Sequence, residues 1–226
     1  MRVALFGGTF DPSHRGHRAL ARLAKDRLHL DLVLIAPVGT QPLKQEATTA
    51  SFEDRMEMAR LAFANEPEME VSLIDAPRTD GRANYTIDTV LELKRGLKAE
   101  DRLFCLMGAD SFLTIGKWYR AAELLVACDF IVGSRLGFDL GRLATALPEK
   151  ISVAAEEADL PGCLVLGLRG TGGGHSRLYL LPDLAEDVSA TEVRAALSQG
   201  AHTAPGGRPV LDPAVARYIH EHRIYG

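Results

Sequence analysis

Apolar and polar positions along the chain alternate between two kinds of segment. Short, continuous apolar runs are typical of strands that are covered on both faces, and such runs fall at 3–6, 32–35, 70–74, 103–107 and 130–132. Between them, apolar residues recur every three or four positions, which predicts helices. These helices are expected at 18–24, 51–64 and 86–95. The alternation predicts an α/β fold with a doubly wound parallel sheet, whose ligands bind at the carboxyl ends of the strands.

Capping residues mark where several helices begin. Ser51 is a predicted N-cap, and Ser189 followed by Glu192 forms a predicted capping box. Asp212-Pro213 combines a capping aspartate with a proline at the first helical position. We therefore predict a single domain over 1–226, with a variable insertion at about 137–180 and a small C-terminal helical part at about 189–226.

The predicted insertion contains a glycine-rich stretch, Gly170–Gly174. Such a stretch invites comparison with phosphate-binding loops, but it has the spacing of neither a dinucleotide fingerprint nor a P-loop. No helix clearly follows it. We interpret it as a surface loop.

Composition narrows the class of protein. Of 226 residues, 46% are hydrophobic, which is enough for a buried core, and the net charge of −4 argues against a nucleic-acid partner. Apolar runs of membrane-spanning length are absent from the sequence, so no membrane partner is expected. The three cysteines, Cys105, Cys128 and Cys163, are odd in number and widely spaced. We predict that they are reduced and that the protein is cytoplasmic.

The stretch from Gly7 to His17 joins the first predicted strand to the first predicted helix. It reads Gly-Gly-Thr-Phe-Asp-Pro-Ser-His-Arg-Gly-His. Glycines let a phosphate approach the backbone, and the start of a helix offers unpaired N–H groups to an anion. His14 and His17 lie three residues apart at that helix start, so both can reach one polyphosphate. The pattern predicts a nucleotide-phosphate site.

Two other interpretations of this stretch are a tight turn with surface histidines and a zinc site. Zinc would need further ligands near the two histidines, and no cysteine or carboxylate lies at a supporting spacing. We therefore predict no metal bound through protein side chains at this position.

The segment 7–17 resembles the signature of the nucleotidyltransferases whose T/H-x-G-H motif binds ATP, and the chain as a whole resembles their nicotinate-mononucleotide adenylyltransferase branch. Further similar segments follow in order: Asn84–Thr86, Gly108–Ser111, Trp118–Tyr119, Val188–Arg194 and Ala216–Ile219. The agreement is close over about 1–135 and 180–225. The resemblance implies a Rossmann-like nucleotidyltransferase fold and transfer of an adenylyl group from ATP to nicotinate mononucleotide, giving nicotinate adenine dinucleotide and pyrophosphate in NAD biosynthesis.

Catalysis by such an enzyme depends on positioning and on neutralising charge. The second pKa of a mononucleotide phosphate is about 6, so the nucleophile is mostly dianionic at neutral pH and needs no general base. We expect His14, His17 and Arg194 to be the catalytic residues, and Mg²⁺ to be bound mainly through the phosphates of ATP. The residues expected to bind ATP are Gly7, Gly8, Thr9, Phe10, Lys44, Gly108, Asp110, Ser189 and Thr191, whereas Asp11 is expected to be a turn residue.

The mononucleotide is expected to bind through Asn84, Tyr85, Thr86, Trp118 and Tyr119. The resemblance implies that Trp118 stacks on the pyridine ring and that backbone N–H groups near Tyr85, Thr86 and Tyr119 receive its carboxylate. A lone tryptophan also occurs commonly as a packing residue, so this alternative stays open for Trp118.

The chain departs from the family pattern at two places. Leu43 stands where the family usually has a histidine between Pro42 and Lys44, and Leu136 stands where a proline is usual. Three alternatives also remain: a nicotinamide-mononucleotide or dual-specificity enzyme, a non-catalytic nucleotide-binding sensor, and a fragment of an aminoacyl-tRNA synthetase. The last would need a basic RNA-binding face that the sequence lacks. A homo-oligomer is possible.

Overall fold

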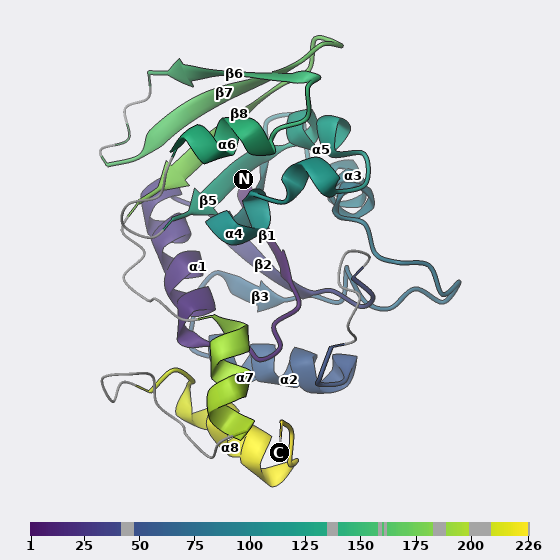
Figure 1. The fold of residues 1–226 in the computed structure, drawn as a ribbon, viewed down its shortest axis with the longest axis vertical. Helices are drawn as coiled ribbons and strands as arrows, with labels where there is room; N and C mark the ends of the chain where they lie inside the picture. The colour runs from purple at the N-terminus through teal and green to yellow at the C-terminus, as the bar shows by residue number, and fades with distance from the viewer. Residues whose placement is uncertain are drawn as a thin grey trace.

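The computed structural model describes residues 1–41, 48–134, 140–157, 160, 162–182, 189–198 and 209–225. These residues form an eight-stranded sheet with helices on both faces (Figure 1). The strands are β1 (Arg2–Gly8), β2 (Leu32–Pro37), β3 (Met69–Val71), β4 (Arg102–Gly108), β5 (Asp129–Gly133), β6 (Ile151–Glu156), β7 (Leu164–Gly170) and β8 (His175–Leu181). The helices are α1 (Arg15–Leu28), α2 (Phe52–Phe63), α3 (Thr86–Gly96), α4 (Ala109–Phe112), α5 (Ala121–Ala127), α6 (Leu140–Ala146), α7 (Ala190–Ser198) and α8 (Pro213–Glu221), with a 3-10 turn η1 (Ile115–Lys117).

The larger part of the sheet is parallel. The strand order is β3-β2-β1-β4-β5-β8-β7-β6, and every pairing from β3 to β8 is parallel. Successive strands are added on one side up to β3 and then, from β4, on the other side of β1. The switch point therefore lies between β1 and β4, where a crevice opens at the carboxyl ends of these strands. The predicted doubly wound fold is confirmed.

The far edge of the sheet differs from the all-parallel prediction. β7 pairs antiparallel with both β8 and β6, so the segment predicted as an insertion supplies three strands to the same sheet. The glycine-rich stretch is the hairpin turn between β7 and β8: Gly170 N–H donates to Gly174 O at 2.9 Å, and Gly173 has φ +86°. A turn this short can join only antiparallel strands.

Most predicted helix starts are confirmed by hydrogen bonds. Ser51 Oγ accepts from Asp54 N–H, and the Asp212 carboxylate accepts from Ala214 N–H. Ser189 and Glu192 form the expected capping box. The strand predicted at 70–74 is wrong in extent, because β3 ends at Val71 and the chain then turns, with Ala76 N–H donating to Leu73 O.

Side chains of the parallel strands alternate between two cores. On one face, Ala4 and Phe6 pack with α1, α2 and α8; on the other, Val3 and Leu5 pack with α3, α4 and α5. Among the described residues, no helix has both the length and the apolar character needed to cross a membrane. Cys105, Cys128 and Cys163 are free thiols, and the first two are buried as predicted.

Candidate functional site

The loop after β1 is held in one conformation by its surroundings. Gly7 and Gly8 end β1, paired with Ala36 and Pro37 of β2. A Cβ atom on Gly8 would lie only 3.3 Å from the ring of Phe10, so the close packing of this ring favours glycine. Phe10 adopts φ +51° and is 1% exposed, which places its ring beneath the loop, against Phe6 and His17.

His14 and His17 begin helix α1 as a stacked pair. Their ring centroids are 3.7 Å apart, and His14 N–H donates to Nδ1 of His17 at 3.3 Å. That bond requires the lone pair on Nδ1, so a neutral His17 carries its proton on Nε2. Burial, and secondarily the neighbouring His14, lower the pKa of His17 well below its usual value. In the ligand-free protein at neutral pH, His17 is thus an uncharged donor.

Arg194 reaches the same loop from helix α7. Its Nη1 donates to the Asp11 carbonyl at 2.6 Å, although 183 residues separate the two in sequence. Its Nη2 lies 3.4 Å from Thr191 Oγ1. The structure therefore brings Arg194 and the histidine-bearing loop together. The Ser189 hydroxyl donates to Glu192 within the capping box, so the structure shows Ser189 in its capping role.

Asp11 and Arg55 support the loop from below. The Asp11 carboxylate accepts from the Thr49 and Ala50 amides and from the Tyr225 hydroxyl, which confirms it as a structural residue. Arg55 is 1% exposed and donates at 2.8 Å to the carbonyls of both Thr9 and Val38. One buried guanidinium thereby ties the end of β1 to the end of β2.

Sequence reasoning missed Arg55. The signal for it was the helical period of α2, which puts Arg55 on the same face as Met58, Ala59 and Ala62, all of them buried. A charged residue on a buried helix face calls for a specific set of partners. Here those partners are backbone carbonyls of the candidate site.

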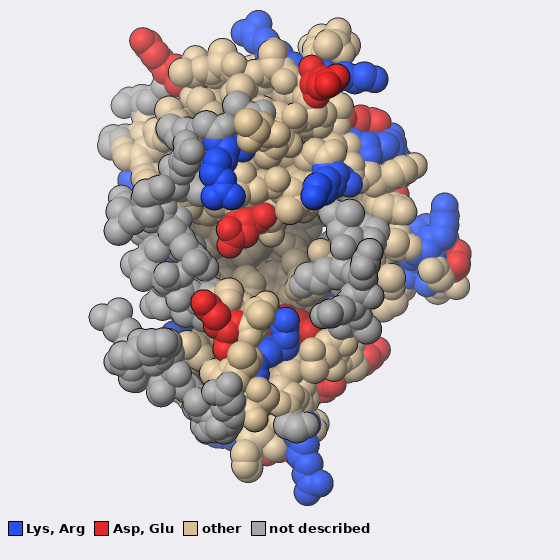
Figure 2. Space-filling view, in the orientation of Figure 1, with Lys and Arg blue, Asp and Glu red and all other residues tan. Residues whose placement is uncertain are grey.

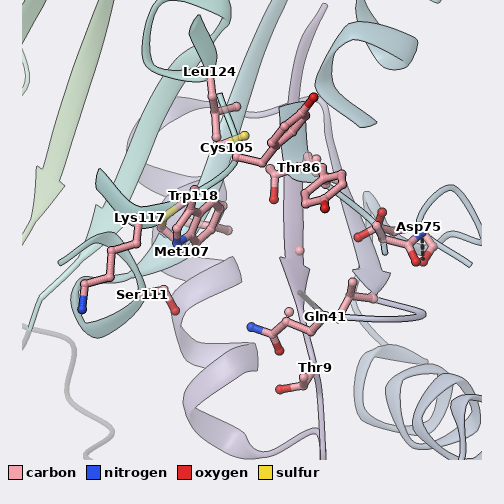
Figure 3. Close-up of a pocket in the computed structure, with 18 residues that line it drawn as sticks. Thr9, Gln41, Asp75, Thr86, Cys105, Met107, Ser111, Lys117, Trp118 and Leu124 are labelled. Carbon is pink, nitrogen blue, oxygen red and sulfur yellow. Dashed lines mark hydrogen bonds between the residues drawn. The ribbon is translucent and has the colours of Figure 1, made fainter. Parts of the chain in front are cut away.

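A cavity of about 440 Å³ lies at the carboxyl ends of the central strands (Figure 3). Seven predicted site residues line it: Gly7, Gly8 and Thr9 at the end of β1, Tyr85 and Thr86 at the start of α3, and Trp118 and Tyr119 after η1. The rings of Tyr85 and Tyr119 are 4.3 Å apart, and Trp118 is half-buried with its indole N–H donating to Thr114 Oγ1 at 3.0 Å. Figure 3 shows Trp118 beside Met107, with Thr86 on the side of the view nearer Asp75.

Asn84 also lines the cavity, but its side chain is engaged with the backbone. Its Oδ1 accepts from Thr40 N–H, and its Nδ2 donates to the carbonyls of Asp75 and Ala76. Asn84 thus fixes the cavity wall by joining the segments after β2 and β3. Beside it, the buried Asp75 lines the cavity and accepts from Thr89 Oγ1, and burial raises the pKa of its carboxyl.

Other cavity-lining residues were not predicted, although they stand next to predicted ones or in predicted strands. They include Gln41, Cys105, Met107, Ser111 and Lys117. Conversely, Gly108 ends β4 and Asp110 is exposed on α4, and neither lines this cavity. Lys44 and Leu43 lie outside the described residues, as does Leu136.

The cavity lies on a face of the molecule that is hollowed at its centre. Figure 2 shows acidic and basic side chains around the rim of this hollow. Within the described residues, no group of three or more His, Cys, Asp and Glu side chains could hold a metal ion.

Known proteins resemble this chain over nearly its whole length. Residues 5–196 match the cytidylyltransferase-like family. A probable nicotinate-nucleotide adenylyltransferase of Laribacter hongkongensis is 37% identical over 99% of this chain and 94% of its own, and one of Geotalea daltonii is 36% identical over 100% and 98%.

Solved structures share the fold at lower identity. A Plasmodium falciparum nicotinic acid mononucleotide adenylyltransferase complexed with NaAD superimposes with a TM-score of 0.68 at 16% identity, covering 99% of this chain and 97% of that one. The full-length match to curated relatives above 30% identity is decisive for the family. The chain belongs to the cytidylyltransferase-like family and, within it, to the nicotinate-nucleotide adenylyltransferases.

Proposed function

We propose that this protein transfers the adenylyl group of ATP to nicotinate mononucleotide. The phosphate oxygen of the mononucleotide attacks the α-phosphorus of ATP, the bond from that phosphorus to the bridging oxygen breaks, and pyrophosphate leaves. The products are nicotinate adenine dinucleotide and pyrophosphate. The observation that carries this proposal is the meeting of Arg194 with the His14–His17 loop beside an aromatic cavity.

The two histidines and Arg194 act on the phosphates in this proposal. His17, neutral and protonated on Nε2, donates a hydrogen bond to a phosphate oxygen without first losing a proton. As negative charge gathers near it, its pKa rises, and it can then carry a full positive charge. Arg194 adds a permanent charge from the opposite side of the loop. These groups stabilise the charge that builds up as pyrophosphate departs.

The backbone supplies the remaining phosphate contacts. Gly8 and Thr9 line the cavity where β1 ends, and the loop leads into the N-terminus of α1, whose dipole favours an anion. We expect Ser189 and Thr191 to add contacts at the start of α7, and Lys44 to approach from its loop. Mg²⁺ would be held mainly by phosphate oxygens of ATP and by water, and would neutralise part of the negative charge of those phosphates.

The aromatic end of the cavity receives the pyridine ring. Trp118 and Thr86 line the same cavity (Figure 3), so a flat ring bound there can stack on the indole while its carboxylate faces the first amides of α3. An anion at a helix N-terminus is favoured by the helix dipole. This placement supports the acid as substrate, because an amide would bring no charge to that helix end.

A pyrophosphate-release assay tests the proposal. ATP is supplied with nicotinate mononucleotide or with nicotinamide mononucleotide, in parallel. We expect release with the acid and a clearly higher kcat/KM for the acid than for the amide. ATP binding without release for any mononucleotide would identify a sensor, and a higher kcat/KM for the amide would overturn the substrate assignment.

A further inference from the structure

Two thiols touch in the wall of the aromatic cavity. Cys105 Sγ and Cys128 Sγ lie 3.5 Å apart, and both residues are buried and free. Cys105 is one of the cavity-lining residues, and Figure 3 shows its sulfur beside Leu124. The adenylyl transfer proposed above uses neither thiol.

The backbone explains why these two side chains meet. Cys105 lies in the middle of β4, opposite Phe130 of β5. Cys128 lies between the end of α5 and the start of β5, and belongs to the same hydrophobic core. At 3.5 Å the sulfurs are in van der Waals contact, whereas a disulfide needs about 2.05 Å. For a disulfide to form, the two side chains need to rotate slightly towards each other. They lie on neighbouring segments, β4 and the residue that precedes β5.

We propose that Cys105 and Cys128 form a reversible oxidation site, at which a small peroxide entering the cavity converts the two thiols to a disulfide. In the first step, the sulfur of Cys105 takes one oxygen from hydrogen peroxide, giving a sulfenic acid and one water. In the second, the sulfur of Cys128 attacks Cys105, and the leaving hydroxyl takes the Cys128 proton to form a second water. In total, two thiols and one peroxide give one disulfide and two waters.

The order of the two steps follows from the position of each sulfur. Cys105 lines the cavity, so a small oxidant that enters the cavity meets this sulfur first, whereas Cys128 is not among the lining residues. The hydrogen bond to Cys105, together with burial, raises the pKa of the Cys128 thiol well above its usual value. Cys128 is therefore a poor first target, and its contact with Cys105 at 3.5 Å, not its acidity, makes it the resolving partner.

The disulfide would change the cavity wall. Drawing Cys105 towards Cys128 moves a lining side chain away from the ligand space and ties β4 to the segment between α5 and β5. We expect a higher KM for the mononucleotide and a smaller change in the KM for ATP, both reversed by a dithiol reductant. This kinetic arm rests on the proposed function, but formation of the disulfide does not.

Mass spectrometry of the folded protein tests the chemistry. After hydrogen peroxide, the intact mass should fall by about 2 Da, and a peptide should link Cys105 to Cys128; dithiothreitol should reverse both changes. Cys163 is the matched control, because it lies outside this pair: the C163S variant should still form the link. A link involving Cys163, or no link under conditions that oxidise Cys105, would overturn the proposal.

The C128S variant separates the two steps. Without a resolving thiol, Cys105 should accumulate as a sulfenic acid, with a gain of about 16 Da that a dimedone probe can trap. Circular dichroism checks that C128S and C105S remain folded. A 2 Da loss that persists in C128S would contradict the assignment of the partner.

Ligand protection tests the route of entry. Once calorimetry has shown that nicotinate mononucleotide binds, adding it at ten times its Kd should slow disulfide formation roughly tenfold, because only the unliganded fraction reacts. An unchanged rate would overturn entry through the cavity. Failure to bind would instead count against the proposed function, so the two failures are distinguishable.

Discussion

The two ends of the candidate site are built in opposite ways. At the phosphate end, residues from distant parts of the chain converge on one loop: Arg55, Arg194 and Tyr225 all bond to Thr9 or Asp11. At the aromatic end, the side chains come from the start of α3 and from the segment after η1, and they are partly open to solvent, with Tyr119 52% exposed. The first end is fixed by partly buried hydrogen bonds between distant residues, whereas the second is an aromatic surface that is partly exposed.

Because of this difference, we expect changes at the two ends to affect kcat and KM separately. Fixed donors contribute most where charge changes during the reaction, so damage to the phosphate end should lower kcat. An aromatic surface holds substrate and transition state alike, so damage to the cavity should raise KM. Four variants or conditions test this comparison, from the largest expected effect to the smallest.

Replacing His17 by alanine should have the largest effect. The change removes a donor at the phosphate end, and we expect kcat to fall by about 10²- to 10³-fold. Steady-state pyrophosphate release provides the measurement. His220→Ala, on the exposed side of α8, is the control and should leave kcat unchanged. Equal losses in both variants would remove His17 from the mechanism.

Replacing Arg55 by methionine should destabilise the protein by removing the side chain that supports the loop at the phosphate end. The carbonyls of Thr9 and Val38 would lose their buried donor, and we expect a loss of about 2–4 kcal/mol in the free energy of unfolding. Urea unfolding measures it.

Arg60 in the same helix offers the matched control for Arg55. It is 51% exposed and pairs only with Glu57 among the described residues. Arg60→Met should change the free energy of unfolding by less than about 0.5 kcal/mol. If the two variants lose the same stability, Arg55 does not hold the loops together.

Replacing Trp118 by alanine should affect the aromatic end alone. Loss of stacking should raise the KM for the mononucleotide about tenfold, while kcat changes little. Trp118→Phe keeps a ring and should recover part of the affinity. A Trp118→Ala protein that fails to fold, as judged by circular dichroism, would show instead that Trp118 is a packing residue.

Acidification should lower the stability of the folded protein through His17, and this is the smallest of the four expected effects. Because the pKa of His17 lies well below 6.5 in the folded protein, the unfolded chain takes up a proton on this ring at a higher pH than the folded one. Above about pH 6.5 neither state is protonated, and as pH falls below that value stability declines, by at most about 1.4 kcal/mol per pH unit.

Urea midpoints at about pH 7.5 and 5.5 measure this effect of His17. Wild type should lose more stability between the two than His17→Gln, which lacks the titrating ring. Equal losses would show that the His17 pKa is not lowered by folding.

Much of the fold and part of the site were predictable because their signals are local. Strands β1, β2 and β4 are marked by their own apolar runs. The starts of α2 and α8 are marked by the capping residues Ser51 and Asp212, which bond to amides two or three residues away. The glycines and histidines of residues 7–17 likewise mark a strand-to-helix turn on their own. These features can be recognised without knowing what packs against them.

The remaining features depend on contacts between distant residues. The antiparallel β6 and β7 lie in a segment without clear periodicity, and their placement follows from a hairpin turn that fixes their direction. The bond from Arg194 to Asp11 spans 183 positions. The residues around Arg55 in the sequence likewise do not indicate that it bonds to Thr9. Long-range pairings of this kind are set by topology, which short motifs do not encode.

The convergence of late residues on an early loop has a consequence for biosynthesis. The loop that follows β1 leaves the ribosome well before α7 and Tyr225, yet these late residues supply two of its supports. Until those residues have been translated, the loop lacks the bonds that fix it. A nascent chain of this enzyme should therefore acquire nucleotide affinity abruptly and late, rather than in proportion to its length.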